Sequence, residues 1–142
     1  MNRGMRLLRE RFRRDSVMAL ATVENGAPSV RNVNAYYENG AFYVITYALS
    51  RKMRQLGANS SCALAGEWFT AHGRGESLGW FGSAGNAPVA AKLRAAFAER
   101  IDNGHNDLSD SNCVILRIRL TDAVLFANGT RYEPDFAEKE KE

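Results

Sequence analysis

Three consecutive residues, Ser50, Arg51 and Lys52, combine a hydroxyl group with two cations at the predicted start of a helix. Serine is a good N-cap because its hydroxyl oxygen accepts a hydrogen bond from a free N–H group of the first turn. Cations at this position oppose the helix dipole, by roughly 0.3–1 kcal/mol each when they are exposed. The arrangement becomes favourable if an anion binds where the N–H groups, the hydroxyl and the cations converge. The pattern therefore predicts a phosphate site where the helix Arg51 to Asn59 begins.

Two predicted strands lead directly into this helix. Ser29 to Tyr37 and Ala41 to Tyr47 alternate in the manner of β-strands, and the pair Asn39-Gly40 between them suits a tight hairpin turn. Arg31 lies on the largely apolar face of the first strand, because side chains alternate with a period of two. Either Arg31 reaches solvent at the rim of the sheet, or it contributes to the phosphate site. Its combination with the helix start favours the second interpretation.

The rest of the chain predicts a mainly β (α+β) protein. The other expected strands are Ser16 to Val23, Ser61 to Trp68, Phe69 to Leu78, Cys113 to Leu120 and Asp122 to Ala127, the last two forming a hairpin. The other expected helices span residues 1–15 and Ala87 to Ile101, with a polar loop from Asp102 to Asn112 and a solvated tail at 134–142. Short turns between successive strands make them antiparallel. We therefore expect one domain over residues 1–142, an antiparallel barrel of six to seven strands with peripheral helices.

Composition narrows the classes of function. The chain has 142 residues and a formal net charge of +3, which suits one ordinary globular domain and favours anionic ligands only weakly. No apolar run approaches the roughly 20 residues that span a bilayer, so we expect a cytoplasmic protein without a membrane partner. Cys62 and Cys113 lie in separate apolar strands and are expected to be buried free thiols. With two histidines, no metal site is expected.

Two further features leave alternatives open. The arginine-rich first helix carries Met5, Leu8 and Phe12 at helical spacing, which favours docking on the barrel over a targeting segment or a nucleic-acid-binding arm. Gly73 and Gly75 either curve a strand or allow a ligand to approach the backbone. Because the first helix is expected to dock on the barrel, nucleic acid is not an expected partner.

The run from Pro28 to Lys52 resembles the pyridoxamine 5′-phosphate oxidase-like family of FMN-binding split barrels. The resemblance rests on Pro28-x-x-Arg31-x-Val33, on the strand Phe42 to Thr46, and on Ser50-Arg51-Lys52. It implies a split barrel with FMN as cofactor and a homodimer with the flavin at the interface. The residues implied for cofactor binding are Arg31, Arg51 and Lys52 for the phosphate, Thr46 and Ser50 as hydroxyl donors, Asn32, Val33 and Asn34 along the ring or ribityl chain, and Trp68 near the contact from the partner chain.

Departures from the family pattern limit the function that the resemblance implies. Tyr36 stands where the vitamin B6 oxidases carry a lysine, and the segment Asn128 to Tyr132 lacks their tryptophan and Arg-x-His group. We therefore expect an FMN-dependent oxidoreductase acting on a small-molecule substrate that the sequence leaves undefined. The alternative is a non-catalytic module that binds flavin, haem or another anionic ligand. Tyr47, His72 and Arg131 are candidates for contact with substrate or flavin, with purely structural roles as the alternative.

Overall fold

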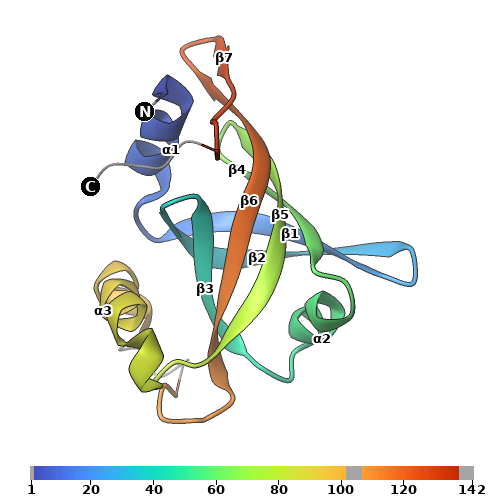
Figure 1. The fold of residues 1–142 in the computed structure, drawn as a ribbon, viewed down its shortest axis with the longest axis vertical. Coiled ribbons are helices and arrows are strands. Elements are labelled where there is room, and N and C mark those ends of the chain that lie inside the picture. The colour runs from blue at the N-terminus through green and yellow to red at the C-terminus, as the bar shows by residue number, and fades with distance from the viewer. Residues whose placement is uncertain (1, 102–106, 138–142) are drawn as a thin grey trace.

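The computed structural model describes residues 2–101 and 107–137. Its elements are α1 (Arg3–Phe12), β1 (Ser16–Glu24), β2 (Ala27–Glu38), β3 (Ala41–Tyr47), α2 (Arg51–Ala58), β4 (Ser61–Gly66), β5 (Phe69–Trp80), a 3-10 turn (Ala84–Asn86), α3 (Ala87–Ala96), α4 (Ala98–Ile101), β6 (Cys113–Ala127) and β7 (Thr130–Tyr132). Within the described residues, seven antiparallel strands form one sheet in the order β3-β2-β1-β4-β5-β6-β7. Pairing of β3 with β6 closes the first six strands into a barrel (Figure 1). The predicted split-barrel architecture is confirmed.

The tight turns follow from three Asn-Gly pairs. Asn25-Gly26, Asn39-Gly40 and Asn128-Gly129 have positive φ angles at both residues, 46–51° for the asparagines and 77–80° for the glycines. Such angles match the right-handed twist of the flanking strands, and asparagine and glycine adopt them at the lowest cost. The meander β1-β2-β3 and the short hairpin β6-β7 result.

The predicted hairpin between Cys113 to Leu120 and Asp122 to Ala127 is wrong. The two segments form one strand, β6, which pairs with β5 along most of its length. Gly73 of β5 pairs with Leu120, and the next residue back, His72, pairs with Asp122, so Thr121 is an extra residue in a β-bulge. A bulge shifts the alternation of inward and outward side chains by one position, and the sequence interpretation mistook this shift for a turn.

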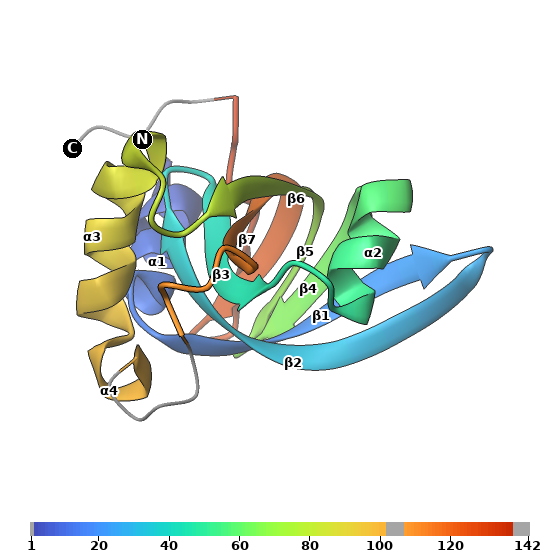
Figure 2. The same ribbon diagram turned by 90° about the horizontal axis from the view of Figure 1, so that it is seen from below.

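Three helices cover parts of the barrel. α1 buries Met5, Leu8 and Phe12 at one end, where the ring of Phe12 contacts that of Phe42 with centroids 5.7 Å apart. The docking interpretation of the arginine-rich helix is therefore confirmed. α2 inserts Leu56 into the core, and α3 packs on the outer side of the barrel (Figures 1 and 2).

The helix expected from Ala87 to Ile101 is interrupted. Phe97 leaves helical geometry, with φ −106° and ψ 21°, and a separate turn, α4, follows it. Leu93 and Phe97, which recur at helical spacing, are nevertheless buried against Ile115 of β6. The interruption redirects the last turn of the helical segment.

The part of the expected tail that is described departs from the prediction. Pro134 is buried, and Phe136 packs against the core, so the chain up to Ala137 is not simply solvated. A Cβ atom on Gly4 would lie 2.9 Å from the Pro134 nitrogen, which shows how closely α1 approaches this segment. Residues 102–106 of the expected polar loop and 138–142 of the tail lie outside the described residues.

Two smaller predictions can be compared with the structure. Cys62 and Cys113 are buried free thiols, as predicted, and burial raises the pKa of the Cys62 thiol to about 11. Gly73 borders the bulge, and Gly75 leaves room for the Leu56 side chain, so sheet curvature and packing account for both glycines. Among the described helices, none is long and apolar enough to cross a membrane.

Candidate functional site

The barrel is open along one seam, between β2 and β3. These strands pair with each other only where Tyr36–Glu38 faces Ala41–Tyr43. Toward its N-terminus β2 continues to pair with β1, whereas β3 continues with β6, so the two edges diverge. We call the opening between Asn32–Asn34 of β2 and Val44–Thr46 of β3 the split. Backbone groups that a closed sheet would pair across this seam are available to a ligand.

The start of α2 lies at one end of the split. The Ser50 hydroxyl caps the helix and accepts a hydrogen bond from the Met53 N–H group at 3.4 Å. The Lys52 ammonium group folds back over this turn and donates to the hydroxyl oxygens of Thr46 and, at 3.5 Å, Ser50. Thr46 is buried on the inner side of β3. The hydroxyls and the ammonium group predicted for the phosphate site are therefore brought together.

Arg31 is held in place by neutral partners. Its Nη1 donates to the Thr22 hydroxyl at 2.7 Å and to the Leu20 carbonyl at 3.2 Å, and its Nη2 donates to Gln55 Oε1 at 3.0 Å. The Thr22 hydroxyl in turn donates to the same Gln55 oxygen at 2.5 Å. The guanidinium group is fixed in position, and no carboxylate among the described residues pairs with its charge.

Burial and mutual repulsion act on the cations of this site. Burial lowers the pKa of Lys52, and the nearby charge of Arg31 lowers it further. Burial, followed by the charge of Arg51, likewise lowers the pKa of Arg31. Within the described part of the chain, none of these three cations forms an ion pair with a carboxylate. A bound anion would raise the pKa values of Lys52 and Arg31 again, because a nearby negative charge stabilises their charged forms.

Glu24 is an acidic residue close enough to Arg51 for the two charges to interact. Its carboxylate accepts hydrogen bonds from Gln55 at 2.9 Å and from Arg54 at 3.1 Å, and these lower its pKa ahead of a smaller contribution from the charge of Arg51. Arg54 is thereby neutralised, in contrast to Arg51. We call Arg31, Arg51 and Lys52 the cation cluster.

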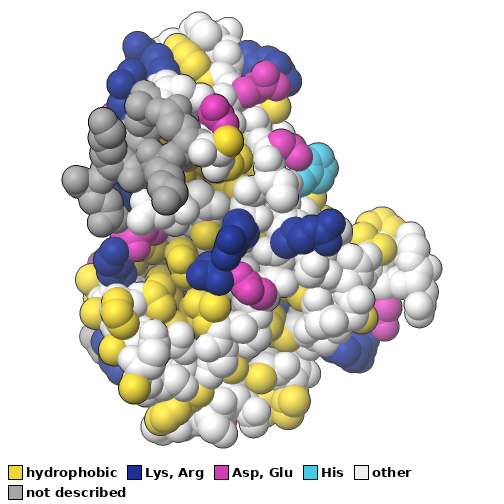
Figure 3. All heavy atoms as spheres, viewed as in Figure 1, with side chains coloured by type: hydrophobic (Ala, Val, Ile, Leu, Met, Phe, Trp, Pro, Cys, Tyr) yellow, Lys and Arg dark blue, Asp and Glu magenta, His cyan; other side chains and the backbone are white. Residues whose placement is uncertain are grey.

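A second basic region on the surface differs from the cation cluster. Figure 3 shows basic side chains beside acidic ones over β5 and β6. Here Glu76 pairs with Arg117 at 2.6 Å and lies 3.6 Å from Arg119. The arginines of this surface share an exposed carboxylate, and exposed ion pairs of this kind contribute little to stability or binding.

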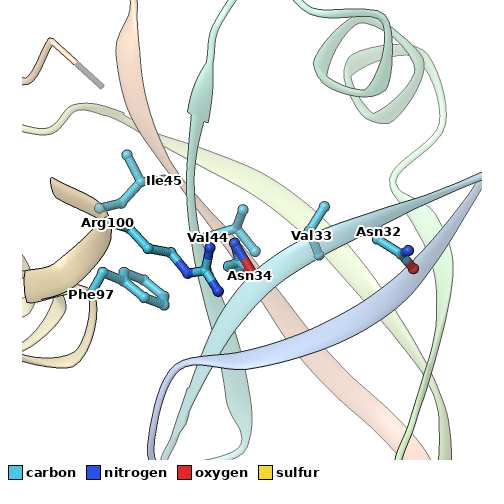
Figure 4. A pocket seen from close by; sticks show the side chains of 7 residues that line it. All are labelled: Asn32, Val33, Asn34, Val44, Ile45, Phe97 and Arg100. Carbon is cyan, nitrogen blue, oxygen red and sulfur yellow. The ribbon is translucent and has the colours of Figure 1, made fainter. Parts of the chain in front are cut away.

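A groove of about 240 Å³ lies along the split. Its walls come from β2, β3 and the interrupted helix α3-α4, and in Figure 4 the Arg100 side chain extends from α4 toward Asn34. The lining residues are Asn32, Val33, Asn34, Val44, Ile45, Phe97 and Arg100. A groove whose exposed lining is mainly polar, with two amides and one cation beside nearly buried apolar side chains, suits a flat, partly polar ligand.

The remaining predicted residues lie elsewhere in the protomer. Tyr47 points to the opposite face of β3 from Thr46 and is 48% exposed. Trp68 lies in the β4-β5 turn, at the other end of the barrel from α2, and is 72% exposed (Figure 1). His72 pairs with Asp122 on the outer face of β5, and Arg131 pairs with Glu133 beyond β7. One protomer does not bring these four side chains to the cation cluster.

Sequence reasoning missed several residues of the site. Thr22 and Gln55 fix Arg31, yet nothing in the β1 pattern marks Thr22 as a partner of a residue nine positions later. The spacing within the predicted helix Ala87 to Ile101 indicates only packing for Phe97 and marks no role for Arg100. The spacing of these two residues would have placed them on one side of a helix, but the interruption at Phe97 has no glycine or proline to announce it.

Six antiparallel strands, closed into a barrel by the β3–β6 pairing and pairing only in part between β2 and β3, define a split-barrel fold. The chain belongs to the pyridoxamine 5′-phosphate oxidase family, whose sequence model matches residues 6–121. The resemblance identified from the sequence is therefore confirmed. No curated protein sequence matches the chain.

Solved structures with the same fold include proteins with different ligands. A FAD-binding protein from Mesorhizobium loti is 17% identical over 82% of this chain and 90% of its own, with a TM-score of 0.66. An F420 reductase is 18% identical over 79% and 91%, with a TM-score of 0.60. A heme binding protein from Mycobacterium smegmatis is 16% identical over 87% and 54%, with a TM-score of 0.64. At these identities the similarity establishes the fold alone.

Proposed function

We propose that this protein binds FMN in the split and acts as an FMN-dependent oxidoreductase on a small-molecule substrate. The observation that carries the proposal is the cation cluster at the end of an open seam, in which neutral hydrogen-bond partners hold Arg31 and Lys52. A phosphate monoester at the start of α2 would accept from Lys52, from Arg31 and from free N–H groups of the first turn. It would also relieve the repulsion that lowers the pKa values of Arg31 and Lys52.

The chain's own residues would orient the cofactor and shield it. Asn32 and Asn34 offer amide groups to polar edges of the ring system, and Ile45 offers apolar surface. Trp68 and Tyr47 remain proposed contacts, Trp68 from the partner chain. When bound, a flavin supplies hydride or electron transfer, so the protein need not provide a separate redox group. The described residues that line the groove include no carboxylate, histidine or cysteine, which is consistent with this division of roles.

The proposal includes a homodimer with the flavin at the interface. Small apolar side chains cover the outer face of β1, β4 and the adjoining strands, namely Val17, Ala19, Ala21, Val30, Ala63, Ala65 and Val124. Val17 and Val30 are 59% and 70% exposed, so the described part of the chain does not cover them. We call this surface the apolar face. Exposed apolar surfaces of this kind are typical of protein contacts.

The apolar face adjoins the split. Asn34 of β2 pairs with Val17 of β1, and Asn32 pairs with Ala19, so groove residues on β2 lie directly beside apolar-face residues on β1. A second copy docked on the apolar face would therefore border the groove and could complete its walls.

The decisive experiment compares FMN with riboflavin, which lacks the phosphate. Purified protein is titrated with each compound while flavin fluorescence and the visible absorbance bands are followed. We expect stoichiometric FMN binding and at least tenfold weaker riboflavin binding. Equal affinities would refute the phosphate assignment. Loaded protein is then mixed with a reduced nicotinamide under anaerobic conditions, where bleaching of the flavin band would support the oxidoreductase role.

A non-catalytic binding module is the second candidate function. The absence of acid–base side chains among the described residues of the groove favours it as much as it favours flavin chemistry. FMN binding without reduction by nicotinamides or turnover with any acceptor would support this candidate, as would tight binding of haem in place of FMN.

A further inference from the structure

His72 and Asp122 form a polar pair at one border of the apolar face. His72 Nδ1 lies 2.9 Å from Asp122 Oδ1, and the two residues are direct partners across β5 and β6. The bulge creates this register, because without the extra residue Thr121 would stand opposite His72. Both side chains of the pair point outward, with exposed fractions of 70% and 69%. The bulge therefore places a titratable pair on the outer side of the sheet.

The His72–Asp122 pair and the apolar face border the same cavity. The cavity has a volume of about 330 Å³ and lies over the outer side of β1, β4 and β5. Apart from Thr70 and the pair, its lining consists of alanine, valine and leucine residues. In one row across the sheet, Ala21 pairs with Ala63, and Ala63 pairs with His72. A second copy that covers these alanines would therefore also reduce the access of water to the pair.

Few other charged groups face the imidazole ring. Its neighbour on β4 is Ala63, and its neighbour on β6 is the carboxylate of Asp122. Arg74 is the next outward residue on β5, and it stands opposite Arg119 of β6 rather than opposite the pair. Neither arginine lines the cavity. Within the described part of the chain, the charge that a second copy would cover is therefore the charge of the pair itself.

The net charge of the pair changes with pH. Histidine is the side chain whose charge ordinarily changes between about pH 5 and pH 8, whereas aspartate stays ionised there. With a neutral imidazole the pair carries one negative charge, and with an imidazolium it is an ion pair without net charge. Removing a net charge from water costs more than removing a compensated pair. The covered state should therefore bind the proton more tightly than the exposed state.

We propose that the His72–Asp122 pair makes the association of two copies depend on pH, so that the dimer is favoured as the pH falls from about 8 to about 5.5. This inference deepens the proposed function and rests on its homodimer. By linkage, the state that binds the proton more tightly gains stability as the pH falls. A two-fold interface contains the pair twice, so up to two protons are taken up for each dimer that forms.

Sedimentation equilibrium measures the dissociation constant of the dimer at about pH 8 and about pH 5.5. FMN-loaded and flavin-free protein are compared, because a phosphate monoester also titrates near pH ~6. In both forms we expect a dissociation constant that is at least about tenfold smaller at the lower pH.

Two variants should change the pH response in different ways. His72→Gln keeps a hydrogen-bonding side chain that does not titrate, so its dissociation constant should not change between the two pH values. Asp122→Asn leaves the imidazolium without a compensating charge, so its dimer should weaken as the pH falls.

Glu76→Gln is the matched control. It removes an exposed carboxylate from β5 at a residue that does not line the cavity, and it should keep the response of the wild type. Melting temperatures at both pH values verify that each variant is folded.

The outcomes separate this inference from the proposed function. A wild-type dimer whose dissociation constant does not change with pH would overturn the role of the pair. A pH response that persists in His72→Gln would do the same, as would an Asp122→Asn dimer that strengthens on acidification. A protein that binds FMN but stays monomeric at both pH values would overturn the proposed homodimer, and this inference with it. A pH-dependent dimer that does not bind FMN would leave the inference standing and refute the cofactor proposal.

Discussion

Replacement of Lys52 by alanine provides the most direct test of the cation cluster. The Lys52 ammonium group contacts Thr46 and Ser50 and lies beside the charge of Arg31. In the complex it would donate one charge-assisted hydrogen bond to the phosphate, which contributes roughly 1.5–3 kcal/mol. Lys52→Ala should therefore weaken FMN binding by about ten- to a hundredfold.

The same substitution makes two further comparisons possible. Riboflavin carries no phosphate, so its affinity should change by less than about twofold, within the effect of a small packing change. Arg54→Ala removes an exposed cation from the same helix, but one that is already paired with Glu24, and it should leave the FMN affinity nearly unchanged. Fluorescence titrations of both ligands against the three proteins measure these values.

Two results would refute the reasoning. An FMN affinity that is unchanged in Lys52→Ala would remove Lys52 from the phosphate site. A parallel loss of FMN and riboflavin affinity would show that the substitution acts on the shape of the split rather than on the phosphate. Because burial and Arg31 both lower the pKa of Lys52 in the free protein, the substitution should not lower the melting temperature by more than a few degrees.

Two other predictions concern stability and assembly. Burial raises the pKa of Glu38, but hydrogen bonds from Lys92 and Arg13, both at 2.7 Å, outweigh this and leave the pKa below its ordinary value. Glu38→Gln should therefore lower the free energy of unfolding by about 2 kcal/mol near pH 7, because both cations are partly exposed. In the wild type this contribution is present above the unfolded-state pKa and is lost as the pH falls through the lower folded-state pKa. In denaturant titrations the wild type and Glu38→Gln should therefore differ in stability at about pH 7 and become similar at about pH 3. For assembly, Ala63→Arg on the apolar face should convert the proposed dimer into a monomer in light scattering, whereas Ala95→Arg on the exposed side of α3 should not; a dimeric Ala63→Arg protein would exclude this face.

The hairpin and the helix start were predictable because local chemistry determines them. Asn39-Gly40 requires positive φ angles that few other residues adopt cheaply, and Ser50 caps α2 as expected. The alternation in β2 placed Arg31 on the apolar face of its strand, which is the inner side of the barrel. The side chains of the predicted phosphate site converge for these reasons.

Features that depend on distant pairing were not predictable in the same way. The bulge at Thr121 appears in the sequence only as a shifted alternation, which a turn would also produce. Arg100 reaches the groove because α4 departs from the axis of α3 and because Asp15, 85 residues earlier, holds its guanidinium group. Trp68 has a role in the site only if a second chain approaches, and no pattern within one chain specifies that approach.

The incomplete pairing between β2 and β3 leaves part of the hydrogen-bond ladder of the barrel unformed. If β2 and β3 continued to pair beyond Tyr36 and Tyr43, the added hydrogen bonds would close the split and stabilise the barrel. The same hydrogen bonds would occupy the backbone groups that a ligand can use. A flat heteroaromatic ring with donors and acceptors along its edge would take the place of the absent strand segment. The ligand would then act as a structural part of the sheet, and its departure would leave β2 and β3 as the first strands to exchange their amide hydrogens with solvent.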